Sequence, residues 1–235
     1  MGLADLHIHT NYSYDGTASV PEVLRKAKQL GLQVIAITDH DEIAGAFEAA
    51  QLAAHYGIEV IPGVEITTAE GDLLAYFITE KVAAGLSYLE TILKVRELGG
   101  VCIAAHPMSK GVGMNSVTAD TLIQVLKNPQ AAETLLGVEV YNGTSIDRMS
   151  NHYARILAMR LKIANTGSSD AHILETIGFG ATEFEGHTAK DLVAALKKRA
   201  TKVRKIKEWS PLRIIGSWGM RYVSSTLAKW AWTAG

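Results

Sequence analysis

Cysteine is almost absent from this chain, and long apolar runs are absent altogether. The 235 residues include one cysteine, Cys102, which excludes an internal disulfide and a thiolate metal cluster. No apolar run approaches the roughly 18 residues of a membrane-spanning helix, and the first residues lack the basic and apolar regions of a secretory signal. With 48% hydrophobic and 20% charged residues, the chain is neither disordered nor fibrous. We expect a cytoplasmic globular protein.

The near-zero net charge conceals two unlike segments. The formal net charge is −1, yet residues 197–235 hold 10 of the 23 lysines and arginines and 1 of the 24 acidic residues. The same segment contains all four tryptophans: Trp209, Trp218, Trp230 and Trp232. We therefore predict two parts, an acidic body over 1–196 and a basic, Trp-rich amphipathic appendage over 197–235, which is helical at 212–232.

Three interpretations of the appendage remain open. Residues 205–235 either pack on the body or on a second copy of the chain, with their cations reaching water, or lie as a peripheral helix on a membrane surface. The third interpretation is nucleic-acid binding by basic and aromatic residues. It is less favoured, because phosphate contacts do not require so many apolar side chains.

Short apolar segments alternate with amphipathic segments along the body. Strands are predicted at 3–6, 33–38, 59–61, 73–78, 101–104, 138–140 and 162–165, and helices at 20–30, 43–55, 87–98, 119–126, 147–161 and 189–199. The connections are long enough for right-handed crossovers, so the pattern predicts an α/β protein with a parallel sheet that closes, or nearly closes, into a barrel.

Histidines and carboxylates follow the predicted strands. They lie in Asp5-Leu6-His7-Ile8-His9, Thr38-Asp39-His40, Gly63-Val64-Glu65, Ala105-His106 and Ser169-Asp170-Ala171-His172. The carboxyl ends of parallel barrel strands share one face, so these side chains are expected to converge there. His7 and His9 are two apart and point to the same side of a strand. Mixed imidazole and carboxylate ligands favour Mn, Zn or Fe, and their number predicts more than one ion.

Taken together, the motifs DLHIHT, SYDGT, ITDHD, GVEI, AHP and SDAH resemble, in order and spacing, those of the PHP (polymerase and histidinol phosphatase) superfamily. The resemblance covers residues 3–186. It implies a distorted (β/α)7 barrel and a phosphoesterase site with two or three divalent metal ions.

The resemblance also implies roles for individual residues. His7, His9, Glu65 and Asp170 would hold one metal ion, and Glu65 would bridge to a second ion that His106 also binds. A third ion would be held by His40 and His172, together with Asp15. Asp5 and Asp39 would orient the histidines.

The chain departs from the family pattern at Asp72, where a histidine is common. Asp72 is therefore either a metal ligand or a turn residue before the next strand, and the number of ions stays open. Glu139 lies in the sixth predicted strand, where it is expected to be a buried strand residue, and Asn142, which follows that strand, is expected to face the site.

The predicted reaction is hydrolysis of a phosphoester by a metal-bridging hydroxide. His172 or His40 would protonate the leaving group. Lys110, Asn142 and Arg148 are candidates for phosphate contacts, and a solvated surface position is the alternative for Arg148. The substrate would be a small phosphorylated metabolite, a nucleotide or an oligonucleotide end.

Two other functions remain as alternatives. The first is an amidohydrolase-type C–N hydrolase, a class whose barrels also open with two histidines but carry a bridging lysine on the fourth strand; the segment LLAYFI has none. The second is a non-catalytic metal-binding scaffold whose basic appendage binds a membrane or nucleic acid.

Overall fold

The computed structural model describes residues 1–110 and 114–233, and within the last helix it describes side chains through Thr226. Nine strands form one sheet in the order β7-β6-β5-β4-β3-β2-β1-β8-β9. They are β1 (Gly2–Asp5), β2 (Val34–Ile37), β3 (Glu59–Thr68), β4 (Gly71–Tyr76), β5 (Val101–Ala104), β6 (Leu135–Asn142), β7 (Ala164–Ser168), β8 (Gly180–Phe184) and β9 (Lys202–Lys205). The helices are α1 (Val20–Gln29), α2 (Ala44–Tyr56), α3 (Tyr88–Glu97), α4 (Ala119–Val125), α5 (Pro129–Thr134), α6 (Arg148–Leu161), α7 (Ala189–Lys197) and α8 (Pro211–Thr233), with a 3-10 turn, η1 (Leu174–Thr176).

The sheet is mixed, although an all-parallel arrangement was expected. β1, β2 and β3 pair in parallel, as do β5, β6 and β7, but β4 is antiparallel to both of its neighbours. The prediction of a crossover connection between β3 and β4 is wrong. β3 continues through Glu65 to Thr68, so only a two-residue turn remains before Gly71. This hairpin brings the end of β3 and the start of β4 to the same rim.

The barrel is nearly closed between β7 and β8. The Thr182 hydroxyl accepts a hydrogen bond from the Gly167 N–H at 3.0 Å and donates one to the Gly167 carbonyl at 2.9 Å. A Cβ at Gly180 would lie 2.3 Å from the Ser168 carbonyl oxygen, so only glycine allows this close approach. The nearly closed α/β barrel agrees with the sequence prediction.

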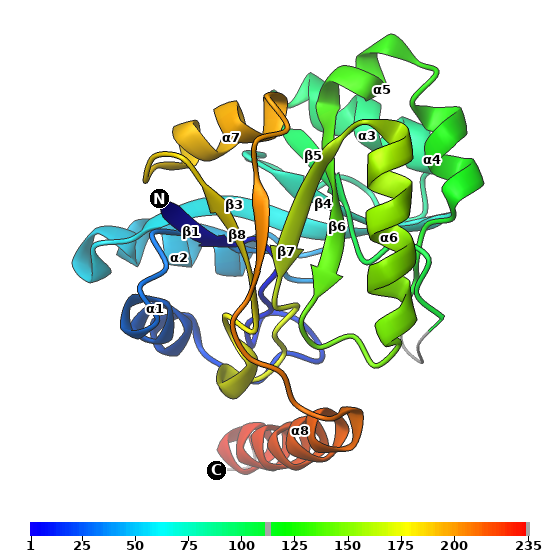
Figure 1. The fold of residues 1–235 in the computed structure, drawn as a ribbon. Coiled ribbons are helices and arrows are strands. Elements are labelled where there is room, and N and C mark those ends of the chain that lie inside the picture. Colours follow the sequence, from blue (N-terminus) through cyan, green and yellow to red (C-terminus); the bar gives the residue numbers. More distant parts are fainter. Residues whose placement is uncertain (111–113, 234–235) are drawn as a thin grey trace.

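Helices cover the outside of the barrel in Figure 1, and their ends follow local capping signals. α1 begins after Ser19, whose backbone N–H and hydroxyl both donate to Glu22, and α3 begins with the same pairing of Ser87 and Glu90. Such capping boxes satisfy N–H groups that have no partner within the helix. The six helices predicted for the body are found within one or two residues of their predicted ends.

Three elements in or beyond the body were not predicted: β8, β9 and α5. β9 lies in the basic segment 197–235, and its lysines and arginine are exposed while Val203 packs against the core. Because the strand is at the sheet edge and pairs only with β8 among the described strands, it needs few apolar residues. The basic segment therefore begins as part of the sheet.

The end of the chain is one helix, α8, close to the predicted range 212–232, and its described tryptophans do not gather in one aromatic cluster. In Figure 1 it crosses the end of the barrel toward which the arrows of β6 and β7 point. Trp209 contacts Phe179 and Trp218 contacts Tyr222, so the described tryptophans form two ring pairs. The side chains of Trp230 and Trp232 lie outside the described residues. Among the described helices none is long and apolar enough to cross a membrane.

Candidate metal centre

The first two histidines enter the site on extended backbone that continues beyond β1. The His9 N–H donates to the Ala171 carbonyl at 2.9 Å on one side, and the Ile8 carbonyl accepts from the Thr38 N–H at 2.9 Å on the other. This pairing fixes the alternation, so Ile8 points into the core while His7 and His9 share the opposite face. Their ring centroids are 5.0 Å apart.

Glu65 lies at the centre of the histidine cluster. Its Oε2 is 3.0 Å from His7 Nε2, 3.2 Å from His9 Nε2 and 3.3 Å from His40 Nδ1. Its Oε1 is 3.0 Å from His106 Nε2. One carboxylate, 1% exposed, therefore faces four imidazoles from three different segments of the chain.

Three overlapping groups of side chains have the composition and spacing of metal sites. They are His7, His9, Glu65 and Asp170; Glu65, Asp72 and His106; and His9, Asp15, His40 and His172. In each group the ligand atoms lie within 4.8 Å of one another. Glu65 is shared by the first two groups and His9 by the first and third, so the structure brings all nine predicted ligands, Asp72 included, to one multi-metal arrangement.

The buried polar atoms of this cluster fit a divalent ion better than they fit one another. His9 Nε2 and Asp170 Oδ1 are buried, 3.2 Å apart, and neither makes a hydrogen bond of good geometry. A buried polar atom without a partner costs free energy comparable to a lost hydrogen bond. An imidazole nitrogen and a carboxylate oxygen that both point at one spot are ordinary ligands of Zn, Mn or Fe.

The charges in the cluster are strongly coupled. Burial lowers the pKa of His7, but the charges of Asp170, Glu65 and Glu139 outweigh burial and raise this pKa well above its usual value. Burial likewise opposes the protonated form of His106, yet its hydrogen bond to Glu65 and the Glu65 charge raise the pKa to about 9. The concentrated negative charge thus attracts protons or metal cations.

The third group lies nearer to solvent than the other two. The side chains of His40, Asp15 and His172 are 14%, 15% and 22% exposed. Asp15 Oδ2 is 3.5 Å from His40 Nε2 and 3.2 Å from His172 Nε2. Burial raises the pKa of Asp15, but hydrogen bonds from the two histidines outweigh it and hold the pKa well below the usual value. Asp15 therefore bridges the two histidines at the rim.

Glu139 is a site residue whose role the sequence did not reveal. Its Oε1 is 3.2 Å from His7 Nδ1, its Oε2 accepts from the backbone N–H of His106 at 2.8 Å, and the residue is fully buried. Its position in the sixth predicted strand was the only available signal. The partner His106 has a left-handed backbone, with φ of 22°, a strained conformation for a non-glycine residue. Glu139 therefore supports both an imidazole and a strained backbone.

Asp5 and Asp39 were expected to orient the histidines, and in the structure their carboxylates accept hydrogen bonds from backbone N–H groups of the segments near the predicted ligands. Asp5 accepts from the backbone N–H groups of Ser169 and Gly178, both at 2.9 Å. Asp39 accepts from the Thr10 backbone N–H at 2.6 Å and from its hydroxyl at 2.8 Å. Both aspartates are short and point toward neighbouring loops, so they hold the backbone that carries the ligands.

Two of the three predicted phosphate contacts are occupied elsewhere. The Asn142 amide is buried and donates to Asp170 at 2.8 Å and to Glu139 at 3.2 Å, so it holds a ligand instead of facing substrate. Arg148 pairs with Glu208 and with the Trp209 carbonyl, because the segment before α8 passes over it.

The third predicted contact, Lys110, lies next to residues outside the described part of the chain. It is exposed, its backbone N–H donates to Asp147, and it is not among the described residues that line the cavity at the metal centre. In the structure as described, no predicted cation therefore reaches that cavity.

Asp72 starts β4 and faces the cluster. Its Oδ1 accepts a hydrogen bond from the Asn115 amide at 2.9 Å. Burial, together with the charge of Glu65, raises its pKa to about 7. A carboxylate forced close to another carboxylate binds a divalent cation readily, because the cation relieves the repulsion.

Fold and side chains together define a metal-binding α/β barrel with its ligands at one rim. The sequence model of the PHP domain family matches residues 5–205 of this chain. The chain belongs to the PHP domain family.

The chain is also similar in sequence to individual proteins. An uncharacterized protein of Methanocaldococcus jannaschii is 40% identical over 164 residues, which cover 64% of this chain and 88% of the relative. A 5'-3' exoribonuclease of Haemophilus influenzae is 48% identical over 64 residues, 27% of this chain and 23% of the relative. A phosphoribosyl 1,2-cyclic phosphate 1,2-diphosphodiesterase of Eggerthella lenta is 37% identical over 65 residues, 28% of this chain and 24% of the relative.

The fold is also found among solved structures. A two-domain protein of Bacteroides vulgatus, described as containing a predicted PHP-like metal-dependent phosphoesterase, superposes with a TM-score of 0.70 at 20% identity. The match covers 86% of this chain and 64% of that one. At this identity the likeness shows a shared fold.

Proposed function

We propose that this chain is a metal-dependent phosphoesterase that hydrolyses a phosphoester of a small molecule at the rim of its barrel. The observation that carries the proposal is the sharing of Glu65 and His9 among three ligand groups. Shared ligands hold divalent ions close together, as in sites that clamp a phosphoryl group for in-line displacement. A single structural ion would need only one closed group.

His7, His9, Glu65 and Asp170 would hold one ion, with Asp72 and His106 completing a second site through Glu65. Bound divalent ions would supply Lewis-acid polarisation of the phosphoryl oxygens and a lowered pKa of nearby water. The chain's own contribution is to fix the ligands: Glu139 holds His7 and Asn142 holds Asp170.

His172 is placed to move a proton at the rim. Its Nδ1 lies 3.1 Å from the Asp170 carbonyl oxygen and its Nε2 lies 3.2 Å from Asp15. Burial lowers the pKa of His172, but the hydrogen bond to Asp15 and the charges of Asp170 and Asp15 outweigh it and raise the pKa. A protonated imidazole at the cavity edge can donate to a leaving oxygen. His40, across Asp15, is the second candidate for this role.

Two sequence relatives support phosphoester chemistry over C–N hydrolysis. Both named relatives above act, by their names, on phosphodiester-type bonds, and each aligns with about a quarter of this chain. β4 carries no lysine, and the carboxylate Glu65 occupies the shared position instead. This arrangement lacks the feature expected of an amidohydrolase-type site.

The test is phosphate release by the chain supplied with Mn or Zn, using a panel of phosphomonoesters, nucleotides, short oligonucleotides and N-acyl amides. We expect release from at least one phosphoester, and a loss of at least 100-fold in His172→Gln. His187→Gln is the matched control, because His187 is exposed on a turn beyond the cluster, and it should retain full activity. Amide hydrolysis without phosphate release would contradict the proposal.

A further inference from the structure

The metal centre opens into a cavity that has two unlike walls. The cavity measures about 580 Å³, within the size range of sites for small molecules. One wall consists of the histidines and carboxylates described above. The other wall is apolar and comes from Met114, Ile146, Ile173, Ile214, Ile215 and Trp218. The last three belong to α8, which lies beyond the residues matched by the family.

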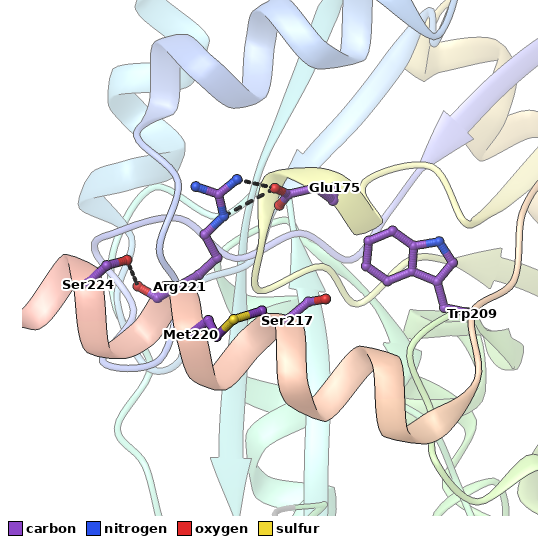
Figure 2. A pocket seen from close by; sticks show the side chains of 6 residues that line it. All are labelled: Glu175, Trp209, Ser217, Met220, Arg221 and Ser224. Atoms are coloured by element: carbon purple, nitrogen blue, oxygen red, sulfur yellow. Dashed lines mark hydrogen bonds and ion pairs between the residues drawn. The ribbon is translucent and has the colours of Figure 1, made fainter.

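α8 is attached to the rim by specific polar contacts. The Trp218 indole N–H donates to the Asp15 carbonyl at 3.1 Å, which ties the helix to the loop that carries a predicted ligand. Figure 2 shows the Arg221 guanidinium reaching from α8 to Glu175 on η1. These contacts hold the helix across the mouth and make its inner face part of the cavity.

Apolar packing fixes the start of the same helix. Ile214 and Trp209 are each 8% exposed and form a small core with Ile173 and Phe179. Trp209, at the right of Figure 2, and Arg221, left of its centre, both line a second cavity of about 340 Å³. The helix is therefore seated by packing at its beginning and by ion pairing further along.

The charge of the cavity limits what it accepts. Its described lining includes four carboxylates, from Asp15, Glu65, Asp72 and Asp170, and no lysine or arginine. Metal ions at the cluster would neutralise one phosphate group. A second phosphate would lie against carboxylates or apolar side chains without a cation, and an unpaired charge in such a setting is strongly disfavoured.

The position of α8 also limits the length of the substrate. A polynucleotide needs a continuous cationic path for its backbone and stacking surfaces for successive bases. Here the mouth is crossed by a docked helix, and the face of the helix toward the metal centre is formed by Ile214, Ile215 and Trp218. Such a wall favours a single uncharged body that buries apolar surface.

We propose that α8 is the specificity wall of the site, and that Ile215 and Trp218 select phosphate monoesters of uncharged, largely apolar alcohols over polyphosphates and polynucleotides. This inference rests on the proposed phosphoesterase function. It names the substrate class that the barrel alone does not determine.

The test uses the metal-supplied full chain and two pairs of probes. The first pair is 2-phenylethyl phosphate and glycerol 3-phosphate, both esters of aliphatic alcohols, compared by kcat/KM. The second pair is 2-phenylethylphosphonate and methylphosphonate, which are not hydrolysed and are compared by calorimetric affinity. The wild-type chain should prefer the phenylethyl member of each pair by at least tenfold.

The variants are Trp218→Ala and Ile215→Ser, with Leu212→Ser as the matched control. Leu212 is on the same helix, is 83% exposed and does not line either described cavity. The two wall variants should lose at least tenfold of the preference in both pairs, because the phenylethyl member loses its apolar contacts. The control should keep the wild-type preference.

The outcomes separate the inference from the function on which it rests. An unchanged phosphonate preference in both wall variants, no preference in the wild-type chain, or faster hydrolysis of an oligonucleotide than of 2-phenylethyl phosphate would overturn the specificity wall. If the phosphonate preference and its loss are observed but no ester is hydrolysed, the wall stands and the phosphoesterase function fails.

Discussion

Glu139 and His7 form a buried carboxylate–imidazole pair, with Oε1 and Nδ1 3.2 Å apart. The opposite ring nitrogen of His7, Nε2, lies 3.0 Å from Glu65. When Nδ1 donates to Glu139, Nε2 keeps its lone pair on the side of the ligand cluster. Glu139 therefore selects the tautomer that a metal ligand requires.

Replacing Glu139 by Gln should weaken metal binding by about 10- to 100-fold, the usual effect of removing such a partner. A glutamine has one acceptor oxygen and cannot serve both His7 and the His106 N–H. Competition against a chelating dye measures the affinity. Glu185→Gln, at an exposed position, is the control, and equal affinities in the two variants would contradict this role.

Asp72 is predicted to be a ligand. Asp72→Asn should lower the bound metal by about one ion per chain, because the amide cannot offset the charge of an ion beside Glu65 and His106. Elemental analysis after dialysis measures this, with the exposed Asp120→Asn as control. Metal content equal to that of the wild-type chain would make Asp72 a turn residue only.

The strand-end ligands were predictable because their positions follow from topology. Once His7, His40, Glu65 and Asp170 are placed at the ends of strands in one barrel, they converge. The same reasoning could not assign Asn142, because its side chain turns toward Asp170 only in the packed structure. It also left Arg148 open between a phosphate contact and a solvated surface position, whereas the structure pairs it with the distant Glu208.

The fold was predictable where periodicity is strong and unpredictable where contacts come from far along the chain. The six body helices carry caps and apolar faces in their own sequence. β9 consists of Lys-Val-Arg-Lys, which has little strand signal, and it forms because the β8 edge is available for pairing. The docking of α8 depends on Trp218 and Arg221 meeting Asp15 and Glu175, more than 40 residues away in sequence in each case.

The pKa of Asp5 leads to a pH dependence of stability. Burial raises this pKa from 3.8 to about 6, despite hydrogen bonds from Ser169 and Gly178. The folded state holds the Asp5 proton more tightly than the unfolded state. The contribution of the protonated carboxyl to folding stability is therefore fully present below about pH 4 and is lost as the pH rises through about 6.

Urea unfolding of chelator-treated protein tests this. The unfolding free energy of the wild-type chain minus that of Asp5→Asn should fall by roughly 2 kcal/mol between pH 4 and pH 6, since one pKa unit is worth about 1.4 kcal/mol and titration is incomplete at both ends of this range. A difference that stays constant or grows over this range would show that the carboxyl is not held as described.

Cys102 provides a probe of metal-linked stability. The thiol is fully buried in β5, and burial raises its pKa, so it should react with alkylating reagents only when the chain opens. Ions that bind the folded state should slow this reaction at least tenfold, since the population of the open chain falls in proportion to the excess of free ion over its Kd. Unfolded chains should react equally with and without metal. Equal rates for the folded protein would contradict metal stabilisation.

The most direct test of a shared-ligand phosphoesterase site is to measure bound metal and released phosphate on the same preparation. The wild-type chain, purified with Mn or Zn, should hold at least two ions per chain and release phosphate from a monoester. Glu65→Gln should hold fewer than two ions and lose at least 100-fold of that activity. Less than one ion per wild-type chain, with no release for either metal, would contradict the account.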